Sequence, residues 1–167
     1  MAGSDYLLKI DTIDGESTQK GHEKWIELNS WSWGVSQTNI GSQSSGAGAG
    51  KVSISSFNIM KRVDSASPPL FLRCAQDQRI TTATLSFTHT NSDGNEVEYY
   101  KITLSNVMVS SIQGGTPPPP APGATAGGDE RPTESLSLNF QKIRFDYTPI
   151  DATGQAGPPV TATATVR

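Results

Sequence analysis

Apolar and polar residues alternate along most of the chain, which is the pattern of β-strands that bury one face. The alternating segments are residues 6–10, 24–37, 51–63, 81–90, 97–112, 134–140 and 142–150. At three places the apolar positions change face by one residue: near Asn29, between Ile54 and Phe57, and at Gln141–Lys142. Such shifts bend and coil long strands. The pattern therefore predicts a mainly β fold, a small closed β-barrel of two packed antiparallel sheets with long loops.

One segment departs from this alternation and predicts a single short helix over about residues 68–77. Ser67 is expected to cap its N-terminus, and Pro68 to take the first helical position. Three apolar residues then share one stripe of the helix: Leu70, Phe71 and Cys74. We expect this stripe to cover one end or side of the barrel, with Cys74 as a small core residue.

Two stretches are too rich in small residues or proline for regular structure. Residues 38–51 are rich in glycine, and residues 114–132 combine four consecutive prolines with glycines. Loops longer than about 12 residues inside a compact domain are usually functional or disordered. At 167 residues the chain fits one domain, 1–167, with 38–51 as an extended loop and 114–132 as a flexible insertion.

The stretch Asn29–Gln37, NSWSWGVSQ, has two faces of unusual contrast. Because side chains alternate along a strand, one face carries Trp31, Trp33 and Val35. The opposite face carries Ser30, Ser32 and Ser36, which are small, polar and uncharged. An ordinary solvated face would mix lysine and glutamate instead. The tryptophan face is expected to pack in the core or against another subunit, and the serine face needs a separate explanation.

Composition narrows the possible partners and the compartment. The net charge of −3 and the isoelectric point near 5.3 give no basic patch, so we expect no nucleic acid partner. Cys74 is the one cysteine, which fits a reducing compartment during folding. The first residues resemble no secretory signal, and no apolar run approaches the roughly 20 residues of a membrane span. We therefore expect synthesis in the cytoplasm without a signal peptide and no membrane span.

Motifs that would indicate catalysis, a metal or a cofactor are weak in this sequence. The segment SGAGAGKVS lacks the first glycine of a phosphate-binding loop, and Val52 stands where that loop needs a hydroxyl. His22 and His89 lie in different segments with no cluster of ligands around them. Three carboxylates, Asp129, Glu130 and Glu134, lie in or beside the predicted flexible insertion, which is a poor place for a catalytic pair. We expect no enzyme activity, no metal site and no cofactor.

Several longer segments together resemble the Hcp (hemolysin-coregulated protein) family of bacterial type VI secretion systems. They are YLLKIDTIDGES, GHEKWIELNSWSWGVSQ, GKVSISSFNIMKRVDSASPPLFLRCAQ, EVEYYKITLSNVMVSSIQ and ERPTESLSLNFQKIRFDYTPID. They cover most of the chain, and their order and spacing are more specific than any single motif. The resemblance implies a β-barrel with one short helix that forms six-membered rings, which stack into the inner tube of a contractile injector.

The resemblance also implies roles for the two unusual surfaces. Ser30, Ser32 and Ser36 become candidates to face the lumen and contact small effector proteins, although Ser32 could also be merely solvated on an isolated barrel. Residues 38–51 would reach the adjacent ring or subunit, with six candidate contact residues: Thr38, Ser42, Gly46, Gly48, Gly50 and Lys51. The implied partners are other copies of the chain, the spike or tip protein, the sheath and effectors, and the implied destination is the medium or a target cell.

Two features depart from the family pattern. The insertion GGTPPPPAPGATAGG is longer and richer in proline than the expected connection, and the ending PPVTATATVR lacks the aromatic, amide-rich ending of some members. The sequence leaves open a tail-tube protein of a phage or related contractile device, or a non-catalytic β-sandwich binding module.

Overall fold

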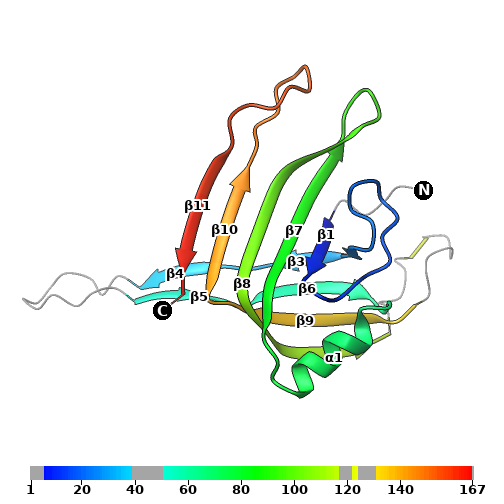
Figure 1. Ribbon diagram of the computed structural model, residues 1–167, viewed down its shortest axis with the longest axis vertical. Coiled ribbons are helices and arrows are strands. Elements are labelled where there is room, and N and C mark those ends of the chain that lie inside the picture. Colours follow the sequence, from blue (N-terminus) through cyan, green and yellow to red (C-terminus); the bar gives the residue numbers. More distant parts are fainter. Residues whose placement is uncertain (1–5, 39–50, 117–121, 124–130, 167) are drawn as a thin grey trace, which may run out of the picture.

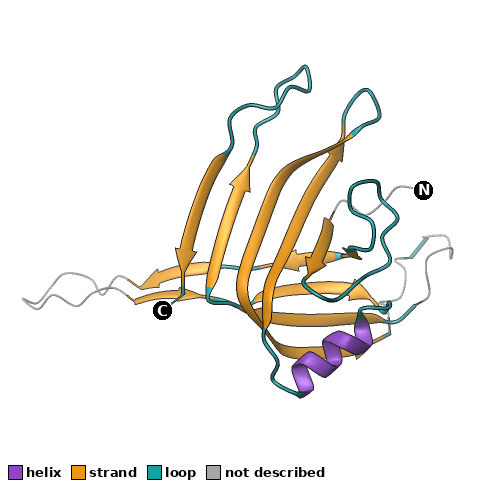
Figure 2. Ribbon diagram, in the orientation of Figure 1, coloured by secondary structure: helices purple, strands orange, loops and turns teal. Residues whose placement is uncertain are grey.

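The computed structural model describes residues 6–38, 51–116, 122–123 and 131–166, which form strands and one short helix (Figure 1). The elements in chain order are β1 (Tyr6–Ile10), β2 (Ile26–Glu27), β3 (Ser30–Ser32), β4 (Val35–Thr38), β5 (Lys51–Ile54), β6 (Phe57–Arg62), α1 (Ser67–Ala75), β7 (Ile80–Thr90), β8 (Glu96–Gly115), β9 (Thr133–Asn139), β10 (Lys142–Tyr147) and β11 (Val160–Thr165). All pairings between these strands are antiparallel. The predicted mainly β class, with two packed antiparallel sheets and a single short helix, is confirmed (Figure 2).

The long strand β8 belongs to both sheets. Its first part pairs with β7 and β10 in the upright sheet, which continues to β1, β2 and β11 (Figure 1). Its last part, Met108–Gly115, pairs with β9 in the second sheet, which continues to β6 and β3. The change of direction falls at Asn106, whose φ of 53° lies in the left-handed region. β8 therefore sets how the two sheets are joined.

The segment from β9 to β10, which pairs with β8, bends at the same level as β8. The chain leaves β9 after Asn139 and enters β10 at Lys142, which is the predicted shift at Gln141–Lys142. There the Asn106 Nδ2 donates to Gln141 Oε1 at 2.5 Å, and the Gln141 N–H donates to the Ser105 carbonyl at 3.0 Å. Side-chain and backbone hydrogen bonds thus replace the regular ladder where both strands turn.

The shift predicted near Asn29 is the crossing between the two sheets. The Leu28 N–H donates to the Tyr6 carbonyl of β1 at 3.0 Å. One residue later, the Asn29 N–H donates to the Met60 carbonyl of β6 at 2.7 Å. Adjacent residues therefore tie β1 of the first sheet and β6 of the second, and the sheets curl around a common core.

The core lies between the inner faces of the two sheets. Its buried side chains come from both sheets and from α1, and they include Leu8, Ile10, Phe57, Ile59, Leu70, Leu85, Phe87, Ile102, Leu104, Leu136 and Leu138. Trp31 is half-buried with its ring between two of them, with centroid distances of 6.0 Å to Phe57 and 4.9 Å to Phe87. The apolar positions of the alternating pattern therefore identify the side of each strand that faces the core.

Two details of the predicted helix are wrong. The helix begins at Ser67, Ala66 takes the N-cap position, and no side chain caps it, whereas the sequence suggested Ser67 as the cap and Pro68 as the first helical residue. The hydroxyl of Ser67 accepts instead from the Asp64 N–H, at 3.0 Å. Phe71 does not share the buried side with Leu70, because its side chain is 63% exposed.

A buried lysine explains why Ser67 has another role. Lys61 lies on the core-facing parity of β6 and is 0% exposed. Its Nζ lies 2.7 Å from Asp64 Oδ1 and 3.0 Å from Glu134 Oε2, and it donates to Ser67 Oγ at 3.0 Å. The Ser67 hydroxyl in turn donates to Glu134 at 2.9 Å. This polar cluster joins β6, β9 and the start of α1.

We expect Lys61→Met to destabilise the protein by about 3–5 kcal/mol, because it leaves two carboxylates without their buried cation. Lys9→Met is a matched control, since Lys9 is exposed on β1 and should change stability little. Urea unfolding followed by tryptophan fluorescence measures both variants. Equal losses for the two lysines would show that the cluster contributes nothing specific.

Candidate functional site

The outer face of the second sheet is lined by small uncharged polar side chains. Strand registers place seven such residues side by side across four strands: Ser30 and Ser32 of β3, Asn58 of β6, Ser135 and Ser137 of β9, and Ser111 and Gln113 of β8. We call this surface the serine wall. Met60, 40% exposed, lies among these residues, and Arg62 follows at one end of the β6 row.

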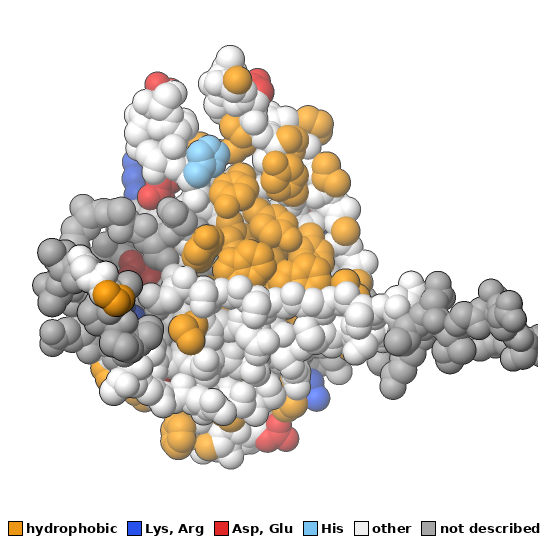
Figure 3. All heavy atoms as spheres, turned by 180° about the vertical axis from the view of Figure 1, so that it is seen from behind, with side chains coloured by type: hydrophobic (Ala, Val, Ile, Leu, Met, Phe, Trp, Pro, Cys, Tyr) orange, Lys and Arg blue, Asp and Glu red, His pale blue; other side chains and the backbone are white. Residues whose placement is uncertain are grey.

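Hydrogen bonds within the serine wall keep its side chains in a fixed arrangement. The Ser137 hydroxyl donates to Asn58 Oδ1 at 2.6 Å, across the β6–β9 pair. The Ser110 hydroxyl, at the β8 bulge, donates to the Ser137 carbonyl at 3.0 Å. The surface can offer hydroxyl and amide groups to a partner while presenting little charge. Figure 3 shows this region as a mostly white band below the orange cluster.

The three predicted lumen candidates do not all lie on this wall. Ser30 and Ser32 are exposed and point away from the core, opposite to Trp31. Ser36 is exposed on β4, outside the wall, where it pairs with Ser53 of β5. Sequence parity alone could not find Asn58, Ser137 or the other members, because they come from distant segments that only strand pairing brings together.

A second surface, which we call the aromatic face, consists of Trp33, Tyr100, Phe145 and Tyr147. Their rings follow one another, with centroid distances of 4.9 Å from Trp33 to Phe145, 6.3 Å from Phe145 to Tyr100 and 6.4 Å from Tyr100 to Tyr147. Burial raises the pKa of the Tyr100 phenol. Tyr147 remains exposed, and Figure 3 shows the orange cluster open to solvent on this side. Apolar area of this kind is typical of an interface.

β4 and β5 form a two-stranded arm that extends from the body (Figures 1 and 2). One side of the arm carries exposed Val35 and Val52, next to half-buried Ile54. At its base, the Ser55 hydroxyl accepts from the Gly34 N–H at 2.8 Å and donates to the Gly34 carbonyl at 3.0 Å.

The arm presents only part of the loop predicted to contact other copies. Thr38 and Lys51 end the two strands of the arm. The remaining candidates, Ser42, Gly46, Gly48 and Gly50, lie outside the described residues.

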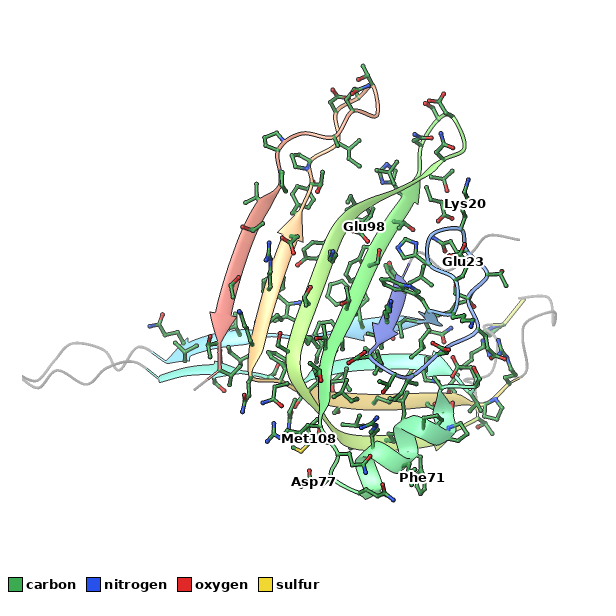
Figure 4. All side chains as sticks on the ribbon, viewed as in Figure 1. Lys20, Glu23, Phe71, Asp77, Glu98 and Met108 are labelled. Atoms are coloured by element: carbon green, nitrogen blue, oxygen red, sulfur yellow. The ribbon has the colours of Figure 1, made fainter. Side chains whose placement is uncertain are left out.

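A convergent polar cluster that the sequence did not reveal lies on the upright sheet. His22 Nε2 is 3.0 Å from Ser86 Oγ and 3.6 Å from Glu98 Oε2. Figure 4 shows Glu98 on β8 facing the loop that carries Lys20 and Glu23. Both oxygens approach the same ring nitrogen, whereas a hydrolytic triad needs the acid on Nδ1 and the serine on Nε2. Ser86 is also 0% exposed. The cluster therefore holds the loop against β7.

Among residues 6–38, 51–116, 122–123 and 131–166, no three His, Cys, Asp or Glu side chains come together as metal ligands would. In the same ranges no helix has the length and apolar character to cross a bilayer.

Comparisons of sequence and of structure find relatives from the same kind of secretion system. The sequence profile of the family described as "Type VI secretion system effector, Hcp" matches residues 7–147. Protein hcp1 of Pseudomonas aeruginosa is 36% identical over 157 residues, covering 93% of this chain and 91% of that protein. A solved structure of a type six secretion system protein superposes with a TM-score of 0.82 at 28% identity, covering 98% of this chain and 96% of that one.

A second solved structure, Hcp1 from Salmonella typhimurium, superposes with a TM-score of 0.68 at 27% identity, covering 98% of this chain and 95% of that one. The match thus extends over the strands that build the serine wall, the aromatic face and the arm. Because the family profile spans most of the chain and a relative shares 36% of its residues over nearly the whole length, the chain belongs to the Hcp family of type VI secretion tube proteins.

Proposed function

We propose that the protein is a structural subunit of the inner tube of a type VI secretion system. Copies form six-membered rings that stack into a tube, which is exported during contraction with small effectors in its lumen. Residues 1–167 act as one tube domain, with 38–51 as an extended loop and 114–132 as a flexible insertion. Both segments begin later than the sequence predicted, because Thr38 belongs to β4 and Gly114 and Gly115 belong to β8, and the first ends before Lys51, which belongs to β5. The observation that carries this proposal, beyond family membership, is the serine wall, a broad ordered surface with little charge.

The serine wall is suited to line a channel. Charged side chains would hold an oppositely charged effector strongly and exclude one of like charge. Hydroxyl and amide groups instead stay hydrated and form weaker, exchangeable hydrogen bonds. Ser30 and Ser32 would then touch effectors from the wall itself, and Ser36 from the base of the arm. A cargo could be retained in the ring and still be released on delivery.

The aromatic face and the free edge of β11 are suited to contacts between neighbouring subunits of a ring. β11, with the sequence VTATAT, is exposed along its whole length and carries no charge. Natural edge strands that stay unpaired are usually protected by charges, proline or bulges. Trp33, beside this region on Phe145, and Val35 on the arm would be buried by the neighbour. Contacts between different surfaces of identical copies form a ring when the rotation from one copy to the next closes the circle.

The other partners follow from the same role. The outside of the tube would face the sheath, its end would carry the spike or tip protein, and the lumen would hold small effector proteins. The protein would be made in the cytoplasm and leave the cell through the machine itself. No catalytic step is part of this function.

The purified protein is expected to form rings of six subunits, because the aromatic face leaves apolar area uncovered in a single copy. Multi-angle light scattering should give the mass of a closed oligomer, and negative-stain electron microscopy should show rings with a central channel. A stable monomer at high micromolar concentration would contradict the proposed function.

Deleting residues 42–48 is expected to leave the subunit folded and to weaken ring stacking. The paired strands of the arm and the sheets need none of these residues. Thermal unfolding should therefore match the parent, while electron microscopy should show fewer and shorter stacks. If the shortened chain still forms tubes of the parental length, residues 38–51 are not part of the stacking contact.

Ser32→Gln is expected to leave unfolding and ring formation unchanged, because the side chain is exposed on the serine wall. The matched control is Ser86→Gln, which overpacks a fully buried serine and should cost about 1–3 kcal/mol. Co-purification of a bound effector should fall for Ser32→Gln, since six bulkier side chains narrow the channel. If intact rings of the variant retain effectors as the parent does, Ser32 only lines the channel and does not recognise effectors.

A further inference from the structure

α1 is apolar on two opposite sides. Towards the core it presents Leu70, which is buried, and Cys74, which is half-buried. Its outer side carries apolar residues at i, i+3, i+4 and i+7 spacing, which we call the α1 ridge: Pro68, Phe71, Leu72 and Ala75. Phe71 is 63% exposed and Leu72 is 48% exposed. Exposed apolar side chains gathered on one face are typical of a surface that another molecule covers, so the ridge indicates such a surface.

A hollow lies between the free ends of two hairpins, β7–β8 and β10–β11. This tip cleft has a volume of about 340 Å³ and is lined by His89, Tyr99, Tyr147, Thr148, Ile150 and Asp151. Its aromatic rings pack together, with 5.5 Å between the centroids of His89 and Tyr99. The Thr148 N–H donates to the Tyr99 carbonyl at 2.8 Å, which joins the two hairpins beside the cleft.

The two hairpin ends are held by the same kind of turn. The side-chain oxygen Oδ1 of Asn91 accepts from the backbone N–H groups two and four residues later, at 3.0 and 2.9 Å. Oδ1 of Asp151 does the same at 2.8 and 2.9 Å. The Thr153 hydroxyl also donates to it and lowers the pKa of the Asp151 carboxyl. The tip cleft is therefore preformed, which reduces the entropy lost when something binds there.

α1 and the ends of the hairpins β7–β8 and β10–β11 lie at opposite ends of the molecule along its longest axis (Figure 1). Figure 4 shows Phe71 at the end away from the hairpin ends. Charge also differs between them. Residues 89–97 and 147–157, at the hairpin ends, contain three carboxylates, Asp93, Glu96 and Asp151, and no lysine or arginine. Residues 66–80, around α1, contain Arg73 and Arg79 against one carboxylate, Asp77.

We propose that the α1 ridge of one copy enters the tip cleft of the next copy, so that copies join head to tail. This inference rests on the proposed tube function and names a contact between successive rings. Phe71 and Leu72 fill the space between the hairpin ends, and the arginines of the α1 end meet the acidic tips. Because the two surfaces differ and lie at opposite ends, the contact repeats indefinitely, as stacking requires.

Paired cysteines test the contact in the full-length chain. In a Cys74→Ser background, Leu72→Cys and Ile150→Cys are combined in one chain, and each is also made alone. Oxidation should link successive copies of the double variant into a ladder on non-reducing gels, while each single variant should give at most dimers. No ladder from the double variant overturns the contact.

A substitution distinguishes this contact from tube assembly itself. Phe71→Ser should raise the protein concentration needed for stacking by roughly tenfold, since a buried aromatic anchor is lost, and should leave single rings intact. Met60→Ser, an exposed apolar residue of the serine wall, is the matched control and should stack like the parent. Stacking by Phe71→Ser at the parental concentration refutes the ridge contact while leaving the tube function standing. Failure of the parent to form rings refutes the tube function.

Discussion

The strand β8 is the constraint on which the arrangement of every surface depends. It crosses from one sheet to the other without interruption, and its turn at Asn106 is matched by the turn of its partner at Gln141. The angle between the sheets cannot change without breaking the pairing of β8 with β9 or β10. The serine wall on one sheet and the aromatic face on the other are therefore held in a fixed relation. A subunit built this way can meet identical neighbours at a repeatable angle.

Alternation along the sequence predicted the strands well because a strand that buries one face must place apolar residues at every second position. The changes of face near Asn29 and Gln141 marked real crossings between sheets. The helix details failed for a tertiary reason. Lys61 needs the Ser67 hydroxyl as an acceptor, so Ser67 could not serve as an ordinary cap. Phe71 turned outward since Leu70 and Cys74 occupy the core side of the helix, which helical spacing could not decide.

The candidate site was predictable only within one strand. Parity identified Ser30 and Ser32 as a polar face, but the neighbours that turn this face into a wall lie on β6, β8 and β9. Their registers depend on long-range pairing, which alternation does not specify. The same limit hid the cluster of His22, Ser86 and Glu98, whose members are separated by 64 and 12 residues along the chain. Motif searches see residues near in sequence, and this molecule builds its surfaces from residues near in space.

The cluster around Lys61 has a consequence for how this protein can evolve. Removing the lysine leaves two carboxylates without a cation, and removing one carboxylate leaves the lysine short of an acceptor. Each single change is therefore costly, while a joint replacement by apolar residues of similar volume can be nearly neutral. Such sign epistasis makes Lys61, Asp64 and Glu134 vary together or stay fixed. Among divergent relatives, these three positions should change as a set, and intermediates with one member altered should be rare.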